Sequence, residues 1–446
     1  MTTYTAINIG PILGTIQMAR KTRQLWAASY LFSYLMECII ESLPESAKII
    51  SPATEGHSKT GVGLYPDRVY IEGNVGKEII EKARQKFIND TKLSSIADGY
   101  FRIMQCTTSE QKVNEAIKDL NHKLDTLELF DIAVESEVEE KVHEYIFRND
   151  SPLFRLAFGH SYYKIEDLET IARSDRPKDS KEASFNKYIC IVQADGDRMG
   201  ESIMNAPEEK IKAISKALLN FGNQATRAIK EFSSSAVPVY AGGDDLLFIA
   251  PVVGDKGTNI FDLIRSIDNC YETVQKEAPL SSLSYGVSIS YHKYPLYEAF
   301  QTAQHQLFDI AKKKVNGKNA IAWDLRKHSG GAFSGAFSKT DTAIYDTFKE
   351  IINVTRDGDT VTAVAHKIRA NQDLIALWMN KDEAPERNEN FFELYMDKID
   401  SDYKEAAKQL LNALCQKKPK SAETLVRNMY GMLRTAKFVK GEPEHE

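Results

Sequence analysis

Two adjacent aspartates follow two glycines in the stretch YAGGDDLL, residues 240–247. Apolar residues flank this stretch on both sides, which predicts a tight turn between two buried strands. Neighbouring carboxylates repel each other, and burying them is costly unless a cation lies beside them. Asp244 and Asp245 therefore indicate a divalent-metal site. The alternative interpretation is a polar hairpin turn that faces water.

A third carboxylate ends the apolar run KYICIVQAD, residues 187–195. In a β-α-β-β arrangement the first strand lies beside the hairpin, so Asp195 is expected to face the turn with Asp244 and Asp245. With the backbone carbonyl of Gly196, the three side chains would form the hard oxygen site that Mg²⁺ or Mn²⁺ prefers. Two such ions, roughly 3.5–4 Å apart, would activate a 3′-hydroxyl and hold a triphosphate. The spacing predicts metal-dependent nucleotidyl transfer.

Glycines and lysines near these carboxylates suggest how a nucleotide would bind. Gly242 and Gly243 lack side chains and would let a nucleotide approach the backbone closely. In the stretch AKKKVNGKN at the end of a helical pattern, Lys312, Lys313, Lys314 and Lys318 are expected to point toward the triphosphate. The alternative for these lysines is a solvated basic helix end, favoured by the helix dipole. Other basic groups fit solvated helix faces, with nucleotide or RNA contact as the alternative: Arg20, Lys21, Arg23, Lys417, Lys418, Lys420 and Arg427.

The elements that must position these residues follow a regular order after residue 187. The order is β-α-β-β-α-β, the split ferredoxin-like arrangement, and a further helix and strand complete the series. The expected strands are 187–195, 237–241, 246–251, 284–292 and 319–324, and the expected helices are 207–232, 258–277 and 296–315.

The rest of the chain reads as mainly helical. A short strand at 4–9 precedes a long helix over 12–43, with apolar residues at three- and four-residue spacing. A polar break at 174–186 is the best domain boundary, and the first 80 residues have room for a second, degenerate sheet domain. The other expected segments are a loop at 51–66, helices throughout 77–147, a Gly/Ser stretch at 329–335 and a helical remainder to 446.

Composition excludes several classes of protein. The chain has 446 residues with 42% apolar and 27% charged residues, an ordinary balance for two or three domains. The net charge of −6 gives no global basic field for bulk nucleic-acid binding. Five scattered cysteines without a CxxC pair argue against a zinc site and for a reduced, cytoplasmic protein. We expect no signal peptide and no membrane span.

Four segments, in this order, carry a resemblance to a known family: IGPILGTIQMARKTRQLWAASYLFSYL, VQADGDRMG, YAGGDDLLFIAP and SYGVSISYHKYPLYEAFQTAQHQLFDIAKKKVNGKNAIAW. They resemble the large subunit of type III-B CRISPR effector complexes, the Cmr group, over most of 4–40 and 187–325. The resemblance implies an α+β fold with two ferredoxin-like palm domains, similar to nucleotidyl cyclases, plus helical insertions. The implied limits are 1–80 with later helical parts for a degenerate first palm, 81–180 for a helical linker domain, 185–328 for a catalytic palm and 335–446 for a helical C-terminal domain.

The same resemblance implies an RNA-guided antiviral enzyme that polymerises ATP into cyclic oligoadenylate once its complex has bound target RNA. Asp195, Asp244 and Asp245 match the family's metal-binding carboxylates, and Lys312 matches a phosphate-contacting lysine of the last palm helix. The implied partners are the other type III subunits, crRNA and target RNA. Some members of the family instead join ATP to S-adenosylmethionine, which is then a co-substrate.

Two departures from the family pattern matter. Many members begin with an HD nuclease domain, whereas this sequence starts at the palm signature and has no HD pair, so we expect no DNase activity of that kind. Many also carry a four-cysteine zinc site, and no such spacing occurs here. The sequence resembles a compact form of the family.

Three alternatives to cyclic oligoadenylate synthesis remain at this point. The same site would serve S-adenosylmethionine as acceptor, and nothing in the sequence separates the two substrates. A scaffold subunit that only binds RNA or partners is a different class, and the intact DGD and GGDD motifs argue against it. A standalone diguanylate cyclase is a weaker alternative, because the N-terminal signature and helical C-terminal region do not fit it.

Overall fold

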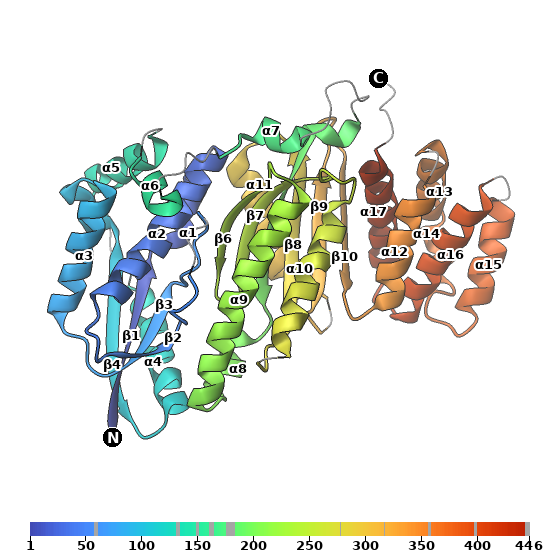
Figure 1. The fold of residues 1–446 in the computed structure, drawn as a ribbon. Coiled ribbons are helices and arrows are strands. Elements are labelled where there is room, and N and C mark those ends of the chain that lie inside the picture. Colours follow the sequence, from blue (N-terminus) through green and yellow to red (C-terminus); the bar gives the residue numbers. More distant parts are fainter. Residues whose placement is uncertain are drawn as a thin grey trace.

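A six-stranded sheet holds the GGDD turn in the computed structural model of the chain (Figure 1). Its strands lie in the order β10-β9-β8-β5-β7-β6, and the four strands β8-β5-β7-β6 are antiparallel neighbours. This is the order expected of the predicted ferredoxin-like unit. The six strands are β5 (Tyr188–Gly196), β6 (Val237–Gly242), β7 (Asp245–Pro251), β8 (Leu283–Tyr291), β9 (Ala320–Arg326) and β10 (Ala332–Ser338).

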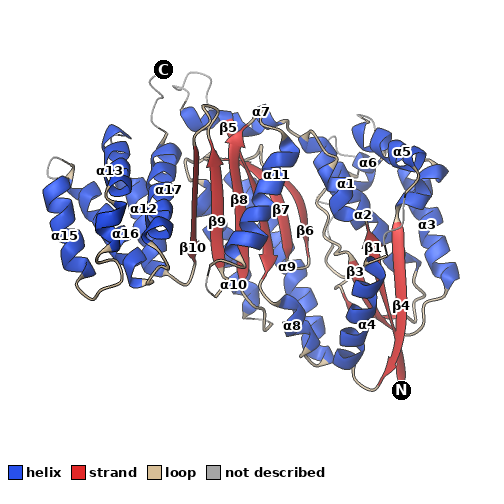
Figure 2. Ribbon diagram, turned by 180° about the vertical axis from the view of Figure 1, so that it is seen from behind, coloured by secondary structure: helices blue, strands red, loops and turns tan. Residues whose placement is uncertain are grey.

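The central strand β5 is buried on both faces. Helices α9 (Glu208–Phe232) and α10 (Ile260–Gln275) cover one face, and α11 (Leu296–His305) lies on the other (Figures 1 and 2). Successive strand residues point to opposite faces, so Cys190 packs with the α9 and α10 core while Ile191 packs with α11. Burial on both faces explains why this strand reads as a continuous apolar run.

Strand β10 (Ala332–Ser338) lies largely within the segment that was expected to be a Gly/Ser stretch, residues 329–335. It pairs antiparallel with β9, and its small residues leave room for its neighbours. A side chain at Gly335 would clash with the ring of Trp323, and one at Gly431 of α17 (Ala422–Lys440) would clash with the carbonyl of Ser334. The glycines therefore serve close packing between a strand and a helix, which composition alone does not distinguish from a linker.

A second sheet lies in the N-terminal part, with strands in the order β2-β3-β1-β4. These strands are β1 (Thr2–Gly10), β2 (Lys48–Ser51), β3 (Arg68–Glu72) and β4 (Arg102–Glu110). Strand β4 contradicts the expectation of helices throughout 77–147. Most of its residues are half-buried, so neither an apolar run nor a clean alternation marks it.

Helix α2 (Thr22–Ser42) lies between the two sheets (Figure 2). It is buried on nearly all sides, because its apolar residues pack against β1 and against β6. The expected single helix over 12–43 is divided into α1 (Ile12–Gln17) and α2. Between them, the backbone N–H groups of Arg20 and Lys21 donate to the side chain of Gln24.

A main-chain contact joins the two sheets. The N–H of Ala241 donates to the carbonyl of Gly63 over 2.9 Å, and Gly63 forms a parallel bridge with Tyr240. Gly63 allows this approach because a side chain there would press on Ser33 of α2. The segment before β3 is thereby fixed beside the GGDD turn.

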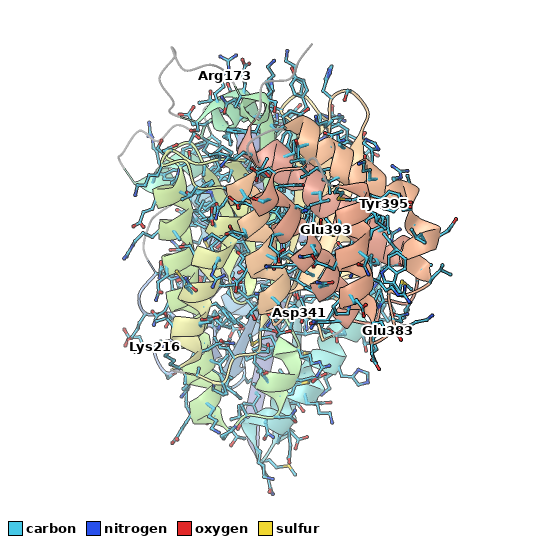
Figure 3. The ribbon with its side chains drawn as sticks, turned by 90° about the vertical axis from the view of Figure 1, so that its right-hand side faces the viewer. Arg173, Lys216, Asp341, Glu383, Glu393 and Tyr395 are labelled. Atoms are coloured by element: carbon cyan, nitrogen blue, oxygen red, sulfur yellow. The ribbon has the colours of Figure 1, made fainter. Side chains whose placement is uncertain are left out.

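The C-terminal part is helical, as expected, and packs on β10 through α17 (Figure 1). The indole N–H of Trp323 donates to the Thr435 hydroxyl over 2.9 Å at this contact. Figure 3 shows Glu383, Glu393 and Tyr395 on the outer face of these helices. In the described part of the chain, no helix is long and apolar enough to cross a membrane.

The structure describes residues 1–57, 61–130, 134–148, 151–159, 165–174, 183–276, 278–315, 317–355, 358–396 and 399–441, so residues 175–182 of the expected polar break lie outside it. The remaining elements are α3 (Lys77–Thr91), α4 (Val113–Glu128), α5 (Ser136–Phe147), α6 (Leu153–Phe158), α7 (Leu168–Arg173), α8 (Met199–Met204), α12 (Thr342–Val354), α13 (Gly358–Ala370), α14 (Gln372–Ala376), α15 (Ala384–Tyr395) and α16 (Ser401–Gln416), the 3₁₀ helices η1 (Ser95–Tyr100) and η2 (Ser184–Lys187), and the π-helix η3 (Gln306–Ala311).

Candidate active site

The turn between β6 and β7 has a two-residue loop. Gly242 pairs with Asp245 at the strand ends, so the loop consists of Gly243 and Asp244, the two inner residues of the expected GGDD turn. Gly243 has a φ of 63°, which favours glycine at the first loop position. Gly242 serves a different purpose, because a side chain there would clash with the phenol of Tyr240.

Asp244 lies directly over Gly196 at the end of β5. A Cβ atom added to Gly196 would be 2.5 Å from Asp244 Oδ2, so only glycine leaves space for this carboxylate. Burial raises the pKa of Asp244 to about 6, and the negative charge of Asp67 acts in the same direction. The backbone N–H of Gly196 donates to the carboxylate and opposes that shift.

Lys312 bridges the end of β5. Its ammonium group forms an ion pair with Asp195 Oδ1 and donates to the carbonyl of Gly196 over 2.8 Å. Only 12% of the Lys312 side chain is exposed. Burial, followed by the nearby positive charge of Lys318, lowers the pKa of Lys312 to about 8, whereas the contact with Asp195 stabilises the protonated form.

The π-helix η3 aims Lys312 at this point. The backbone N–H of Lys312 donates to Leu307, five residues earlier, over 3.0 Å. The helix lies close to the sheet because Gly286 of β8 has no side chain to hold it away. The wider helical turn therefore changes the direction in which Lys312 leaves the helix, a frequent use of π-turns at functional sites.

Three of the predicted metal donors converge here. They are the carboxylates of Asp195 and Asp244 and the backbone carbonyl of Gly196, which Lys312 and the GGDD turn bring together. Within the described residues, no three His, Cys, Asp or Glu side chains form a preformed metal cage. Two carboxylates and one carbonyl suit Mg²⁺ or Mn²⁺, which keeps water and phosphate oxygens as its other ligands.

Asp245 faces a separate space. It lines a cavity of about 240 Å³ between the two sheets, together with Asp67 from the segment before β3. Asp245 is exposed at this cavity, yet desolvation by the surrounding protein raises its pKa above the usual range. The negative charges of Asp244 and Asp67 raise this pKa further. Burial also raises the pKa of Asp67, against the effect of Arg68.

Sequence reasoning missed Asp67. It belongs to the stretch YPDR, which reads as an ordinary loop. Its place in the cavity depends on the contact between Gly63 and β6, made across more than 170 residues of chain. The other cavity walls are mostly apolar and come from α1, α2, β6, β7, α11 and η3, including Leu13, Tyr240, Phe300 and Phe308.

The second aspartate of the DGD motif, Asp197, has a structural role. Asp197 is 4% exposed and accepts hydrogen bonds from the hydroxyls of Ser282 and Ser284, at 2.7 and 2.9 Å. It also accepts one from the backbone N–H of Asn319 over 2.8 Å. These contacts tie β5 to β8 and to the turn that contains Lys318.

The other basic candidates lie away from the carboxylates. Lys313 pairs with Asp309 on its own helix, and the Arg23 guanidinium stacks over Phe154 at 4.1 Å from the ring centroid. Lys417 forms an ion pair with Asp341. Arg427 lines a different cavity of about 420 Å³ beside α17, and Lys418 and Lys420 are exposed on the C-terminal helical part.

Known families match two parts of the sequence. Residues 4–146 match the family described as CRISPR-associated protein Cmr2, N-terminal, and residues 188–322 match Cas10/Cmr2, second palm domain. The CRISPR system Cmr subunit Cmr2 of Pyrococcus furiosus is 32% identical in an alignment of 174 residues that covers 33% of this chain and 19% of that protein. The match therefore spans less than a fifth of the curated relative.

Solved structures share the fold over most of the chain. The Csm1-Csm4 cassette, solved in complex with cA4 and with one ATP, has a TM-score of 0.59 at 13% identity and covers 98% of this chain and 70% of its own. A type III-B Cmr-beta structure in the apo state has a TM-score of 0.56 at 12% identity, covering 89% and 77%. These structures therefore share the overall fold of this chain over most of its length.

Proposed function

The chain belongs to the Cas10/Cmr2 family of CRISPR proteins, and from this premise we propose that it makes cyclic oligoadenylate from ATP within a type III complex. The observation that carries the proposal is the convergence of Asp195, Asp244 and the Gly196 carbonyl beside Lys312. Other type III subunits, crRNA and target RNA would be the partners. Binding of ATP and cA4 by the similar Csm1-Csm4 cassette supports the substrate class.

The proposed reaction joins adenosine units through 3′–5′ linkages. The 3′-hydroxyl oxygen of one nucleotide attacks the α-phosphorus of the next, the bond to the β-phosphate oxygen breaks, and pyrophosphate leaves. Mg²⁺ or Mn²⁺, when bound, would supply the charge that favours ionisation of the hydroxyl and departure of pyrophosphate. Asp195, Asp244 and the Gly196 carbonyl would hold it, while Lys312 and Lys318 neutralise phosphate charge.

The cavity lined by Asp67 and Asp245 is the proposed site of the acceptor nucleotide. Asp245 lies at the boundary between this cavity and the GGDD turn, so it is positioned to orient the attacking hydroxyl and to accept its proton. Catalysis then depends mainly on positioning and electrostatic stabilisation.

A second acceptor fits the same cavity. Asp67 and Asp245 place two carboxyl groups among mostly apolar walls, an environment that favours a positively charged ligand with apolar surface. The sulfonium of S-adenosylmethionine has this character, so joining ATP to S-adenosylmethionine is the second candidate.

Product analysis by mass spectrometry tests both candidates. The reconstituted complex is incubated with target RNA, Mg²⁺ or Mn²⁺ and ATP, with and without S-adenosylmethionine, beside a D244A/D245A variant. We expect cyclic adenylates that disappear in the variant. An adduct that requires S-adenosylmethionine would keep the site and change the acceptor, whereas no product with any activating RNA would favour a scaffold subunit.

A further inference from the structure

Lys312 contacts two of the three proposed metal donors. Its ammonium group lies within bonding distance of Asp195 Oδ1 and of the Gly196 carbonyl, and the side chain is largely buried. Two cations cannot share these oxygens at such short range without strong mutual repulsion. The lysine and a divalent ion therefore compete for the same acidic pocket.

We propose that Lys312 acts as a built-in counterion that holds the metal site closed until nucleotide binds. Resting on the proposed function, this inference adds an order of events: metal and nucleotide enter together, and Lys312 exchanges Asp195 and the Gly196 carbonyl for a phosphate group. Lys312 is thus a positioning residue before binding and a phosphate ligand afterwards.

The surroundings of Lys312 suit such an exchange. A lysine has a flexible four-carbon stem and can move its charge while its backbone stays fixed. Lys318 lies close enough to disfavour the positive charge of Lys312, and it would share an incoming phosphate. The phenyl ring of Phe308, whose centroid is 5.9 Å from the ammonium group, also lines the cavity, so Lys312 lies near that cavity.

A built-in counterion makes metal binding depend on nucleotide. Without nucleotide, a divalent ion must displace Lys312 and leave its ammonium group buried among other positive charges. With nucleotide, the phosphates accept the displaced charge, so each ligand strengthens the binding of the other by the same factor. Removal of the Lys312 charge should uncouple the two.

Binding of Mn²⁺ to the full chain, followed by electron paramagnetic resonance without nucleotide, tests this inference. We expect K312M to bind Mn²⁺ about 10-fold more tightly than the wild type, within the range typical of coupled sites. K312Q, which keeps a hydrogen-bond donor for Gly196, serves if K312M folds poorly. K313M is the matched control, since Lys313 pairs with Asp309 on the helix surface, and D195N/K312M should lose the gain.

A second titration adds a non-hydrolysable ATP analogue. The analogue should tighten Mn²⁺ binding to the wild type several-fold and have a smaller effect on K312M. Equal or weaker Mn²⁺ binding by both K312M and K312Q without nucleotide would overturn the inference, even in a complex that makes product. Tighter binding in a complex that makes no product would leave the inference standing and refute the proposed function.

Discussion

At the scale of single residues, the aspartates of the DGD and GGDD motifs make different contacts and have different roles. Asp195 and the Gly196 carbonyl contact Lys312, and Asp244 lies over Gly196. Asp245 faces the cavity, and Asp197 holds the sheet through serine hydroxyls. The sequence places these residues at one sheet edge, since strand ends and the hairpin are readable. It does not distinguish the braced aspartate from the others, because that depends on hydroxyl groups that lie more than 80 residues away.

Gly196 offers a sharp test of this division. We expect G196A to lower nucleotide synthesis by about 100-fold, because the new Cβ forces Asp244 away from its place and misplaced reacting groups cost about that much. The thermal-unfolding midpoint should change little. The control is G200A on α8, where the nearest atom to an added Cβ is 4.0 Å away. Equal activity of G196A and the wild type would show that Asp244 does not need this position.

At the scale of elements, apolar patterns predicted β5, β6, β7 and β8 with their order in the sheet. They failed for β4 and β10, whose residues are half-buried or small, because long-range pairing and not local preference makes them strands. Asp67 could not be predicted as a site residue for the same reason. A loop residue joins the site only through the contact of its segment with β6.

Helix α9 contains a lysine at an unfavourable position. Lys230 donates to the carbonyls of Ala236 and Ser234, and burial lowers its pKa to about 8. The unfolded chain binds this proton more tightly, so the contribution of Lys230 to stability rises from pH 8 toward its unfolded pKa of about 10.4. The gain is at most about 3 kcal/mol.

Substitution of Lys230 checks this pH dependence. The thermal-unfolding midpoint of K230M should exceed that of the wild type by the largest amount near pH 7. This difference between the two proteins should be smaller at pH 10. The matched control is K216M on the exposed side of the same helix, labelled in Figure 3. An identical difference at both pH values for K230M would contradict the expected role of burial.

At the scale of the whole molecule, three units meet through close backbone contacts. The first sheet reaches the palm sheet at Gly63, and the C-terminal helices reach it at Gly431. Such contacts need glycine because any side chain would separate the packed elements. The GGDD sheet is thus held from both sides by surfaces that it shares with its neighbours.

Gly431 allows this packing to be tested. A helix interior normally gains stability when alanine replaces glycine, but here the added Cβ would clash with the Ser334 carbonyl. We expect G431A to destabilise the contact by about 1–3 kcal/mol, as overpacking does. Hydrogen exchange in β10 and α17 should accelerate, whereas G14A in α1, where an added Cβ meets no atom within 4 Å, should leave it unchanged. Unchanged exchange in G431A would mean that the helix shifts without cost.

The backbone bridge at Gly63 has a consequence for control from outside. It connects the segment between β2 and β3 of the first sheet to the strand that leads into Gly243 and Asp244, so a rotation of that sheet would be transmitted to the turn through this contact. A macromolecule that binds the first sheet and favours one orientation of it would then also favour one position of Asp244. By thermodynamic reciprocity, nucleotide held at the turn changes how tightly that macromolecule is gripped, by the same factor.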